Sequence, residues 1–396
     1  MADAPNTYDA EPIPEAAREE IDRLLNSGDL FRYTAPENAP VSLLEAEFAE
    51  VMGTRFALAV SSCSAAIFLS LRALGLPEGA KVAIPAFTFA AVPSAIVHAG
   101  LTPVLSEVDD SLRLNIADFE TKLDQGVSAV LISHMRGHTS DMDAIMRLAA
   151  ARDLPVIEDA AHSLGTLWDG RTVGTIGSMG CFSFQSYKLV NAGEGGILIT
   201  DDEDLIAKAV IMSGAYEHNW KKHATIARRC EHWQNRLPLY NMRMNNLSAA
   251  VIRPQLPFIE KRVSDGRRNH DYVAAALNAS PWMHVPPPLE KELRAPDSIQ
   301  FLLEGMTEDE IKSFALAAKK RGVSVQVFGM SQNNARAFWN WQFLGDVPEL
   351  ELTRNMLMRT CDVRLPARLT RSELDFVAAA LCGAATDVKG PSQAVA

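Results

Sequence analysis

The sequence predicts an α/β protein with a large domain, whose mostly parallel sheet is flanked by helices, and a smaller C-terminal α+β domain. Between residues 56 and 201, short apolar runs of strand type alternate with stretches of helical period. This alternation is typical of a parallel sheet covered on both faces. After Asp201 the pattern changes to longer helical and polar stretches, which indicates that a second, smaller unit follows.

Composition and charge narrow the class of protein. The chain has 396 residues, of which 47% are hydrophobic and 22% charged, as in ordinary globular proteins. A net charge of −11 argues against nucleic acids and anionic membranes as main partners. No apolar run reaches the roughly 18 residues that a membrane span needs.

The cysteines and the N-terminal sequence predict a cytoplasmic location. The five cysteines are scattered and show no CxxC spacing, which favours reduced thiols and no metal site. The first twenty residues are acidic and lack the apolar core of a signal peptide.

The large domain is expected to cover residues 13–250, after a flexible segment at 1–12. Residues 13–27 and 41–53 have apolar side chains at helical spacing and predict two amphipathic helices. The predicted strands that follow lie at 56–60, 81–85, 103–107, 128–134, 154–160, 177–185 and 195–201, and predicted helices separate the first from the second, the second from the third and the fourth from the fifth.

A linker helix and the small domain are expected at 251–386, followed by a disordered tail at 387–396. Residues 240–278 predict one long helical region with a possible break near Pro254. The other elements predicted in this half are strands at 298–306 and 323–329 and helices at 308–322 and 372–383.

One lysine and one aspartate suit the chemistry of pyridoxal phosphate. Asp159 ends a predicted strand, and Lys188 lies in a polar loop before Gly-Glu-Gly-Gly. The coenzyme needs a lysine to form an imine with its aldehyde, and an anion that keeps its ring nitrogen protonated. Taken singly, a lysine in the setting of Lys188 is more often a solvated loop residue, and an aspartate in the setting of Asp159 is more often a helix cap. The two residues together favour the coenzyme site.

Other polar residues also follow predicted strands. In such sheets ligands bind beyond the carboxyl ends of the strands, where His134 and the turn Ser61–Ser64 are expected. That turn precedes a helix whose first free amides and dipole favour an anion. The alternative is an ordinary serine cap.

Five motifs in order resemble those of a known family. They read SSCSAAIFLSLRALGL, PAFTF, EDAAHSLG, SFQSYKLVNAGEGG and NMRM. The chain resembles the DegT/DnrJ/EryC1/StrS group of pyridoxal-phosphate aminotransferases, of fold type I, from about residue 13 to 265 and more weakly to the end. The resemblance implies amino transfer from an amino-acid donor, Glu or Gln, through pyridoxamine phosphate, with ping-pong kinetics. The implied acceptor is a ketone or aldehyde, such as a keto-sugar nucleotide or a related small compound.

The resemblance also implies roles for single residues. Lys188 matches the lysine that binds the coenzyme and shuttles the proton, and Asp159 matches the partner of the ring nitrogen. The other implied coenzyme contacts are His162 at the ring hydroxyl, Phe89 stacked on the ring, Ser64, the Ala65 amide and Ser183 at the phosphate, and Asn241 at the phosphate of the neighbouring subunit. Active sites shared in this way imply a homodimer. By composition alone, His162 could instead be a helix-surface residue and Phe89 a core residue.

Departures from the family pattern concern the substrate. Cys63-Ser64 stands where Gly-Thr is usual, and His134-Met135-Arg136-Gly137 stands where His-x-Tyr-Gly is frequent. His134 and Arg136 are therefore candidate substrate contacts; Arg136 binds a carboxylate or phosphate of the substrate, or pairs with a surface acid. The segment 329–345, rich in aromatic residues, is least like the family, and packing is favoured over ligand contact for its two Trp and its Phe338.

Two other functions remain open at this point. A pyridoxal-phosphate sugar dehydratase is one, although such relatives tend to replace the lysine with histidine, which Lys188 argues against. A non-catalytic regulatory protein on the same fold is the other, and it would lack the colour of bound coenzyme.

Overall fold

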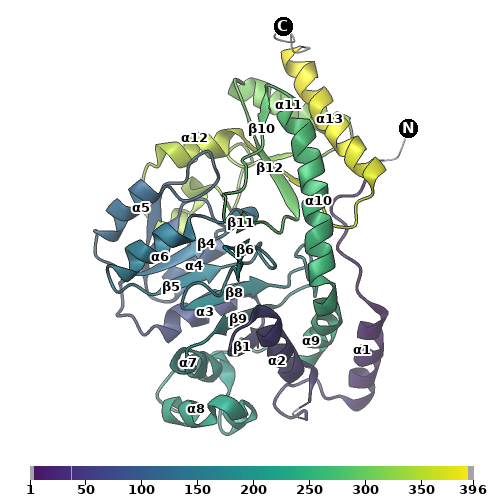
Figure 1. Cartoon of the computed structure of the whole chain (residues 1–396). Helices are drawn as coiled ribbons and strands as arrows, with labels where there is room; N and C mark the ends of the chain where they lie inside the picture. The colour runs from purple at the N-terminus through teal and green to yellow at the C-terminus, as the bar shows by residue number, and fades with distance from the viewer. Residues whose placement is uncertain (1–3, 37, 391–396) are drawn as a thin grey trace.

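A seven-stranded sheet forms the centre of the larger half of the molecule (Figure 1). This is a computed structural model, and it describes residues 4–36 and 38–390. The strand order is β1-β9-β8-β5-β4-β2-β3, and only β9 runs antiparallel to its neighbours. The strands are β1 (Phe56–Val60), β2 (Lys81–Pro85), β3 (Thr102–Ser106), β4 (Val127–Ser133), β5 (Val156–Asp159), β8 (Met179–Ser183) and β9 (Gly196–Thr200). The predicted fold class, a mostly parallel sheet between helices, is confirmed.

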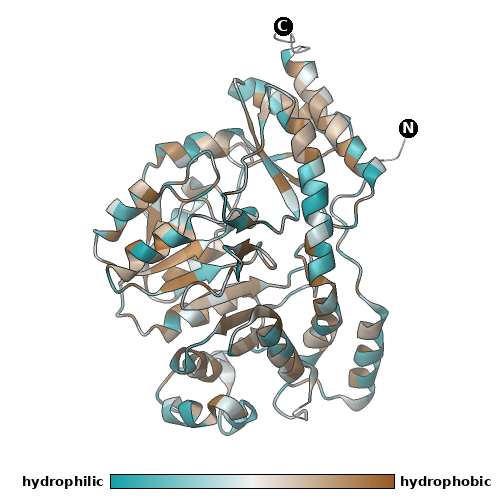
Figure 2. Ribbon diagram, viewed as in Figure 1, coloured by the Kyte–Doolittle hydropathy of each residue, from teal (hydrophilic) through white to brown (hydrophobic). Residues whose placement is uncertain are grey.

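Helices cover both faces of this sheet because alternate strand residues point to opposite sides. Leu58 and Val60 pack in one apolar cluster with α3, α4 and α7, while Ala59 packs in another with α2, α5, α6 and α9. Figure 2 shows the central strands largely in the colours of apolar residues. The helices of this half are α1 (Glu15–Ser27), α2 (Pro40–Met52), α3 (Cys63–Ala73), α4 (Ala91–His98), α5 (Ile116–Leu123), α6 (Met142–Ala150), α7 (Glu203–Gly214), α8 (Ala227–Trp233) and α9 (Asn246–Ile252).

The C-terminal half contains a four-stranded antiparallel sheet in the order β10-β12-β14-β13. The long helix α10 runs from the large sheet to this sheet, and α11 and α13 pack with it around a third apolar cluster (Figure 1). The elements are α10 (Ile259–Asn278), β10 (Met283–His284), β12 (Ser298–Leu303), α11 (Glu308–Lys320), β13 (Gln326–Val327), α12 (Glu351–Arg359), β14 (Thr360–Arg364) and α13 (Arg371–Lys389). A small three-stranded sheet is built from β6 (Leu167–Trp168), β7 (Arg171–Thr172) and β11 (Glu292–Leu293). It joins the two halves of the molecule, because β11 of the C-terminal half pairs with β6 of the larger half.

Some elements differ from the prediction. The break predicted near Pro254 is present, because a 3₁₀ segment at Arg253–Phe258 separates α9 from α10. Helices α5 and α12 and strand β14 were not predicted; β14 carries a buried aspartate and an arginine, which hide its strand pattern. Of the predicted strand 323–329, only Gln326–Val327 pairs with a neighbour.

Parts of both chain ends that were predicted to be flexible or disordered make defined contacts. Helix α13 includes residues 387–389 of the predicted tail, and Asp387 pairs with Arg321 at 2.8 Å; positions 391–396 lie outside the described residues. Near the N-terminus, where flexibility was predicted for 1–12, the Asn6 carbonyl accepts a hydrogen bond of 2.6 Å from Arg368, and Thr7 is buried. Positions 1–3 are likewise outside the described residues.

All five cysteines are free thiols. Among the described residues, no helix combines the length and apolar character needed to span a membrane.

Candidate active site

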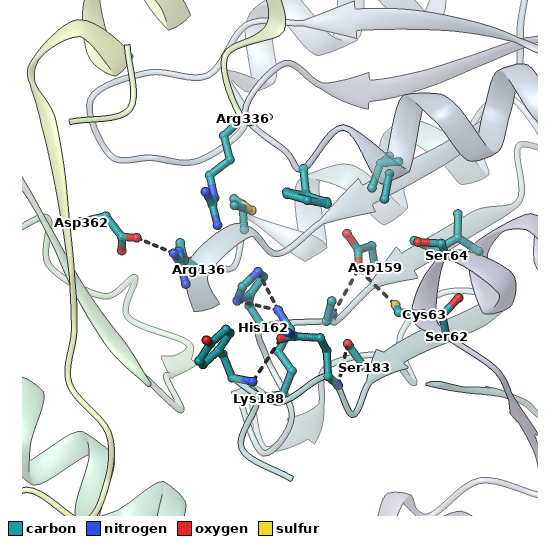
Figure 3. Close-up of a pocket in the computed structure, with 18 of the residues that line it drawn as sticks. Ser62, Cys63, Ser64, Arg136, Asp159, His162, Ser183, Lys188, Arg336 and Asp362 are labelled. Atoms are coloured by element: carbon teal, nitrogen blue, oxygen red, sulfur yellow. Dashed lines mark hydrogen bonds and ion pairs between the residues drawn. The ribbon is translucent and has the colours of Figure 1, made fainter. Parts of the chain in front are cut away.

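A cavity of about 490 Å³ lies beyond the carboxyl ends of the large sheet's parallel strands, and residues of the C-terminal half close it (Figure 3). It brings together most of the residues that the sequence singled out. The predicted residues that line it are Ser64, Phe89, Arg136, Asp159, His162, Ser183 and Lys188. Ala65, His134 and Asn241 do not line it.

Asp159 is a buried carboxylate held in a fixed orientation at the end of β5. Its Oδ2 accepts a hydrogen bond of 2.8 Å from the Ser133 hydroxyl, and its Oδ1 accepts one of 3.1 Å from the Ala161 amide. The thiol of Cys63 approaches Oδ1 at 3.8 Å. These contacts hold the Asp159 carboxylate in one orientation at the cavity.

Lys188 and His162 meet within the cavity. Lys188 Nζ lies 2.9 Å from His162 Nε2. Burial lowers the pKa of Lys188 to about 8; Asp297 opposes this shift and Arg136 adds to it. Burial, followed by the charge of Lys188, holds the pKa of His162 well below its usual range. The imidazole is therefore neutral and accepts from the lysine, whose free amine is accessible at a much lower pH than that of an exposed lysine.

The start of α3 faces the cavity, with one difference from the prediction. Ser62 caps the helix, because its Oγ accepts a hydrogen bond of 3.1 Å from the Ala65 amide. That amide is thus already used and is not the free donor that was predicted. Ser62, Cys63 and Ser64 line the cavity at the positive end of the helix dipole.

Gly196 of β9 lets this turn come close to the sheet. A Cβ atom at position 196 would lie 2.3 Å from the carbonyl carbon of Ser62 and 2.4 Å from the Cys63 nitrogen. Any larger residue at position 196 would push the turn away. The last glycine of the Gly-Glu-Gly-Gly motif is therefore required by the close approach of the turn to β9.

His134 is buried outside the cavity and does not line it. The residue is 1% exposed, and its Nε2 lies 3.1 Å from a Glu158 side-chain oxygen. Glu158 also accepts hydrogen bonds from the amides of Gly174, Ile176 and Gly177 at 2.7–2.8 Å. His134 and Glu158 thus tie a loop to the end of the sheet, which argues against the substrate contact predicted for His134.

Arg136 lines the cavity and also forms an ion pair with Asp362 of β14. The acid is buried in the cavity wall rather than exposed on the surface. Arg136 has a positive φ of 55°, a conformation that most residues avoid. The tertiary contact between the two halves of the chain holds it there.

The C-terminal half adds residues that the sequence did not assign to the site. Arg336, Asp362, Arg364 and Gln326 all line the cavity. In the segment 329–345, Phe338 and Trp341 are each 1% exposed, as expected for packing residues. The density of arginine and aromatic residues around position 336 was the available signal for a site there, but the prediction concerned only the two Trp and Phe338, for which packing was favoured.

Phe89 and Asn241 occupy different positions relative to the cavity. Phe89 is 43% exposed, which excludes the core role left open for it, and its ring lies at the cavity wall. Asn241 is exposed and outside the cavity of its own chain. Its neighbour Met242 accepts a hydrogen bond of 2.8 Å from the Ser61 amide, which places this segment beside the end of β1.

The sequence matches known proteins over most of its length. Residues 13–382 match the model of the DegT/DnrJ/EryC1/StrS aminotransferase family. The spore coat polysaccharide biosynthesis protein SpsC of Bacillus subtilis (strain 168) is 34% identical over 268 residues, 66% of this chain and 66% of that protein. GDP-perosamine synthase of Escherichia coli O157:H7 is 32% identical over 245 residues, 62% of this chain and 65% of that protein. The chain thus covers slightly less than two thirds of the length of these relatives.

A solved structure extends the similarity to the whole fold. 3-Amino-5-hydroxybenzoic acid synthase superposes with a TM-score of 0.84 at 24% identity, covering 97% of this chain and 100% of that chain. At this identity the likeness establishes the fold, and the family match over residues 13–382 establishes descent. The chain belongs to the DegT/DnrJ/EryC1/StrS aminotransferase family.

Proposed function

We propose that the protein is a pyridoxal-phosphate-dependent aminotransferase, which moves an amino group from an amino-acid donor to a keto or aldehyde acceptor. The observation that carries the proposal is that one cavity contains both Lys188, with a pKa lowered to about 8, and the buried carboxylate of Asp159. Perturbed titratable groups that converge in a cleft are typical of catalytic sites.

The residues present fit the coenzyme. Lys188 would offer the amine for its aldehyde, and Asp159 would offer a carboxylate that the Ser133 hydroxyl and the Ala161 amide hold in place. Ser62, Ser64 and the free amides of the α3 start suit a phosphate. When bound, pyridoxal phosphate supplies a protonated ring that withdraws electrons from the substrate carbon.

The chain's own residues then perform the proton transfers. Lys188 Nζ takes the proton from the α-carbon of the donor, because an amine with a pKa of about 8 is neutral near pH 7 far more often than an exposed lysine is. His162, neutral and 2.9 Å from Nζ, accepts a hydrogen bond and holds the amine in place. Asp159 would hold its carboxylate beside the ring nitrogen of the coenzyme. Donor and acceptor use the same cavity in turn, which produces ping-pong kinetics.

The relatives of this chain favour one class of amino acceptor over the others. Among the relatives are a GDP-perosamine synthase and a protein of spore coat polysaccharide biosynthesis, which favours a keto-sugar nucleotide as the first acceptor to test. Lys188 in the cavity argues against the dehydratase alternative. Free thiols throughout support the predicted cytoplasmic setting.

Separate half-reactions test the function. Protein loaded with pyridoxal phosphate should lose its visible absorbance band when L-glutamate or L-glutamine is added, because the coenzyme takes up the amino group. After removal of the amino acid, keto-sugar nucleotides or simple keto acids should restore the band. A protein that stays colourless with the coenzyme would favour the regulatory alternative. A band that no amino acid changes would contradict amino transfer.

We also propose a homodimer in which Asn241 of the partner subunit contacts the phosphate. The side chain is exposed and does not line its own chain's cavity, so it is available to another subunit. A phosphate carries nearly two negative charges and needs more donors than the α3 turn and Ser183 supply. A ligand bound across an interface stabilises the dimer by mass action.

Mixing two inactive variants should restore part of the activity. Lys188→Ala lacks the amine, and Asn241→Asp places a negative charge beside the phosphate, which weakens coenzyme binding. If sites are shared, a heterodimer contains one site with both native residues, and activity should approach about one quarter of wild type in an equal, randomly assorted mixture. If each site is built from one chain, every site in the heterodimer is defective and activity stays at background. Mixing either variant with itself is the control.

A further inference from the structure

The lysine loop, residues 184–195 between β8 and β9, is long and irregular. The large sheet holds its two ends, because Ser183 pairs with Gly196 in the ladder. Long loops without such pairing open at a low free-energy cost unless other contacts hold them. The amine of Lys188 lies 2.9 Å from His162 Nε2 (Figure 3), and contacts from outside the loop are needed to keep it there.

Gln255, in the 3₁₀ segment Arg253–Phe258, holds this loop at Asn191. The Asn191 amide donates to Gln255 Oε1 at 3.1 Å, and Gln255 Nε2 donates to the Asn191 carbonyl at 2.6 Å. The side chain thus pairs with a loop residue as a neighbouring strand would. Its second donor goes to the Val251 carbonyl at 2.8 Å, and its second acceptor position takes Arg262 at 3.0 Å. All hydrogen-bonding positions of this fully buried amide are used.

Arg262, in the first turn of α10, holds the loop at Leu189, the residue after Lys188. Its Nη1 donates to the Leu189 carbonyl at 2.7 Å as well as to Gln255, and its Nη2 donates to the Pro12 carbonyl at 2.8 Å. A buried cation at the start of a helix is unfavourable, and burial lowers the pKa of Arg262. The hydrogen bonds to three oxygens offset this cost, and they join three separate segments of the chain.

Apolar packing by itself leaves the direction of the loop undetermined. Val190 is fully buried in the core of the larger half, which fixes how deep the loop lies. Burial of apolar surface is non-directional, whereas the hydrogen bonds to Leu189 and Asn191 lie on either side of Val190 and orient the backbone. Gln255 and Arg262 do not line the cavity, so their contacts are with the loop and not with a ligand in it.

We propose that Gln255 and Arg262 are positioning residues, which hold the lysine loop so that the amine of Lys188 stays in the cavity. The inference rests on the proposed function for the chemistry of that amine, but the support of the loop is a property of the protein without coenzyme. A displacement of about 1 Å lowers the rate of a well-oriented reaction by about 10²-fold. Loss of either residue should therefore change rates far more than binding.

The pKa of Lys188 in protein without coenzyme tests the inference. Competitive labelling with acetic anhydride at several pH values, read by mass spectrometry of the Lys188 peptide, should give about 8 for wild type. In Gln255→Met and Arg262→Gln the loosened loop should let the amine reach water, and the pKa should rise toward that of an exposed lysine, about 10.4. Gln255→Met removes no charge, so a rise there reports exposure. The groups around Nζ stay unchanged: His162, Asp297, Arg136, Cys63 and Asp159.

Arg253→Gln is the matched control, because it removes a guanidinium from the same 3₁₀ segment. Arg253 donates to Glu47 of α2 at 2.7 Å and to Glu20 of α1 at 2.9 Å. Its variant should lower the melting temperature and leave the pKa of Lys188 at about 8. Arg262→Lys, which keeps one charged donor for the loop, should give a pKa between those of Arg262→Gln and wild type, and it replaces Arg262→Gln if that variant does not fold.

Kinetics on the protein loaded with pyridoxal phosphate separate positioning from binding. Gln255→Met and Arg262→Gln should lower kcat by about 10²-fold and leave KM near that of wild type. A pKa of Lys188 that stays at about 8 in Gln255→Met and in the Arg262 variants overturns the inference. If the wild type transfers no amino group while the variants still raise this pKa, the proposed function fails and the positioning role stands.

Discussion

Replacing Lys188 by alanine should abolish turnover and the covalent attachment of the coenzyme. Among the residues that the structure describes, Lys188 is the one lysine that lines the cavity, and burial lowers its pKa to about 8. No second lysine there can take its place. General acid–base catalysis contributes about 10²–10⁴-fold, and kcat should fall by at least about that factor. Mass spectrometry after borohydride reduction should find the coenzyme on wild-type protein and none on the variant.

Lys320→Ala serves as the matched control for this loss of an amine. Lys320 is exposed at the end of α11, outside the cavity, and its variant should keep wild-type turnover and attachment. A Lys188→Ala protein that retains amino transfer, or that is labelled at another lysine with normal turnover, would refute the assignment.

Changing Asp159 to asparagine should leave coenzyme binding possible but remove most of the activity. The neutral amide cannot stabilise a protonated ring nitrogen, and the ring then withdraws electrons poorly. The amide also cannot accept from both donors that hold the carboxylate, the Ser133 hydroxyl and the Ala161 amide, without reorienting. We expect kcat to fall by more than about tenfold, or about 1.4 kcal/mol of barrier.

Coenzyme affinity and kcat should be measured together on this variant. Asp309→Asn, at a side chain that is 94% exposed, removes the same charge far from the cavity and should be neutral. If kcat of Asp159→Asn stays within about tenfold of wild type, the pairing of Asp159 with the ring nitrogen is wrong.

The sequence by itself determined the fold class and most of the residues that the large sheet brings to the cavity. Strand and helix periods alternate along the chain, and the parallel strands end at one edge of the sheet. Residues just after those strands, such as Asp159 and Ser64, must therefore meet, and Lys188 joins them from the loop after β8. These positions depend on local pattern and on a topological rule, so no distant contact had to be known.

The tertiary structure alone decided which residues of the C-terminal half line the cavity. Arg136 pairs with Asp362, 226 positions away, and Arg336 faces the same cavity from a segment whose sequence resembles a packing region. It also placed His134 outside the cavity, against Glu158. Nothing local marks β14 as a strand or Asp362 as the partner of Arg136, because the energy of a buried ion pair depends on which two segments the fold brings together.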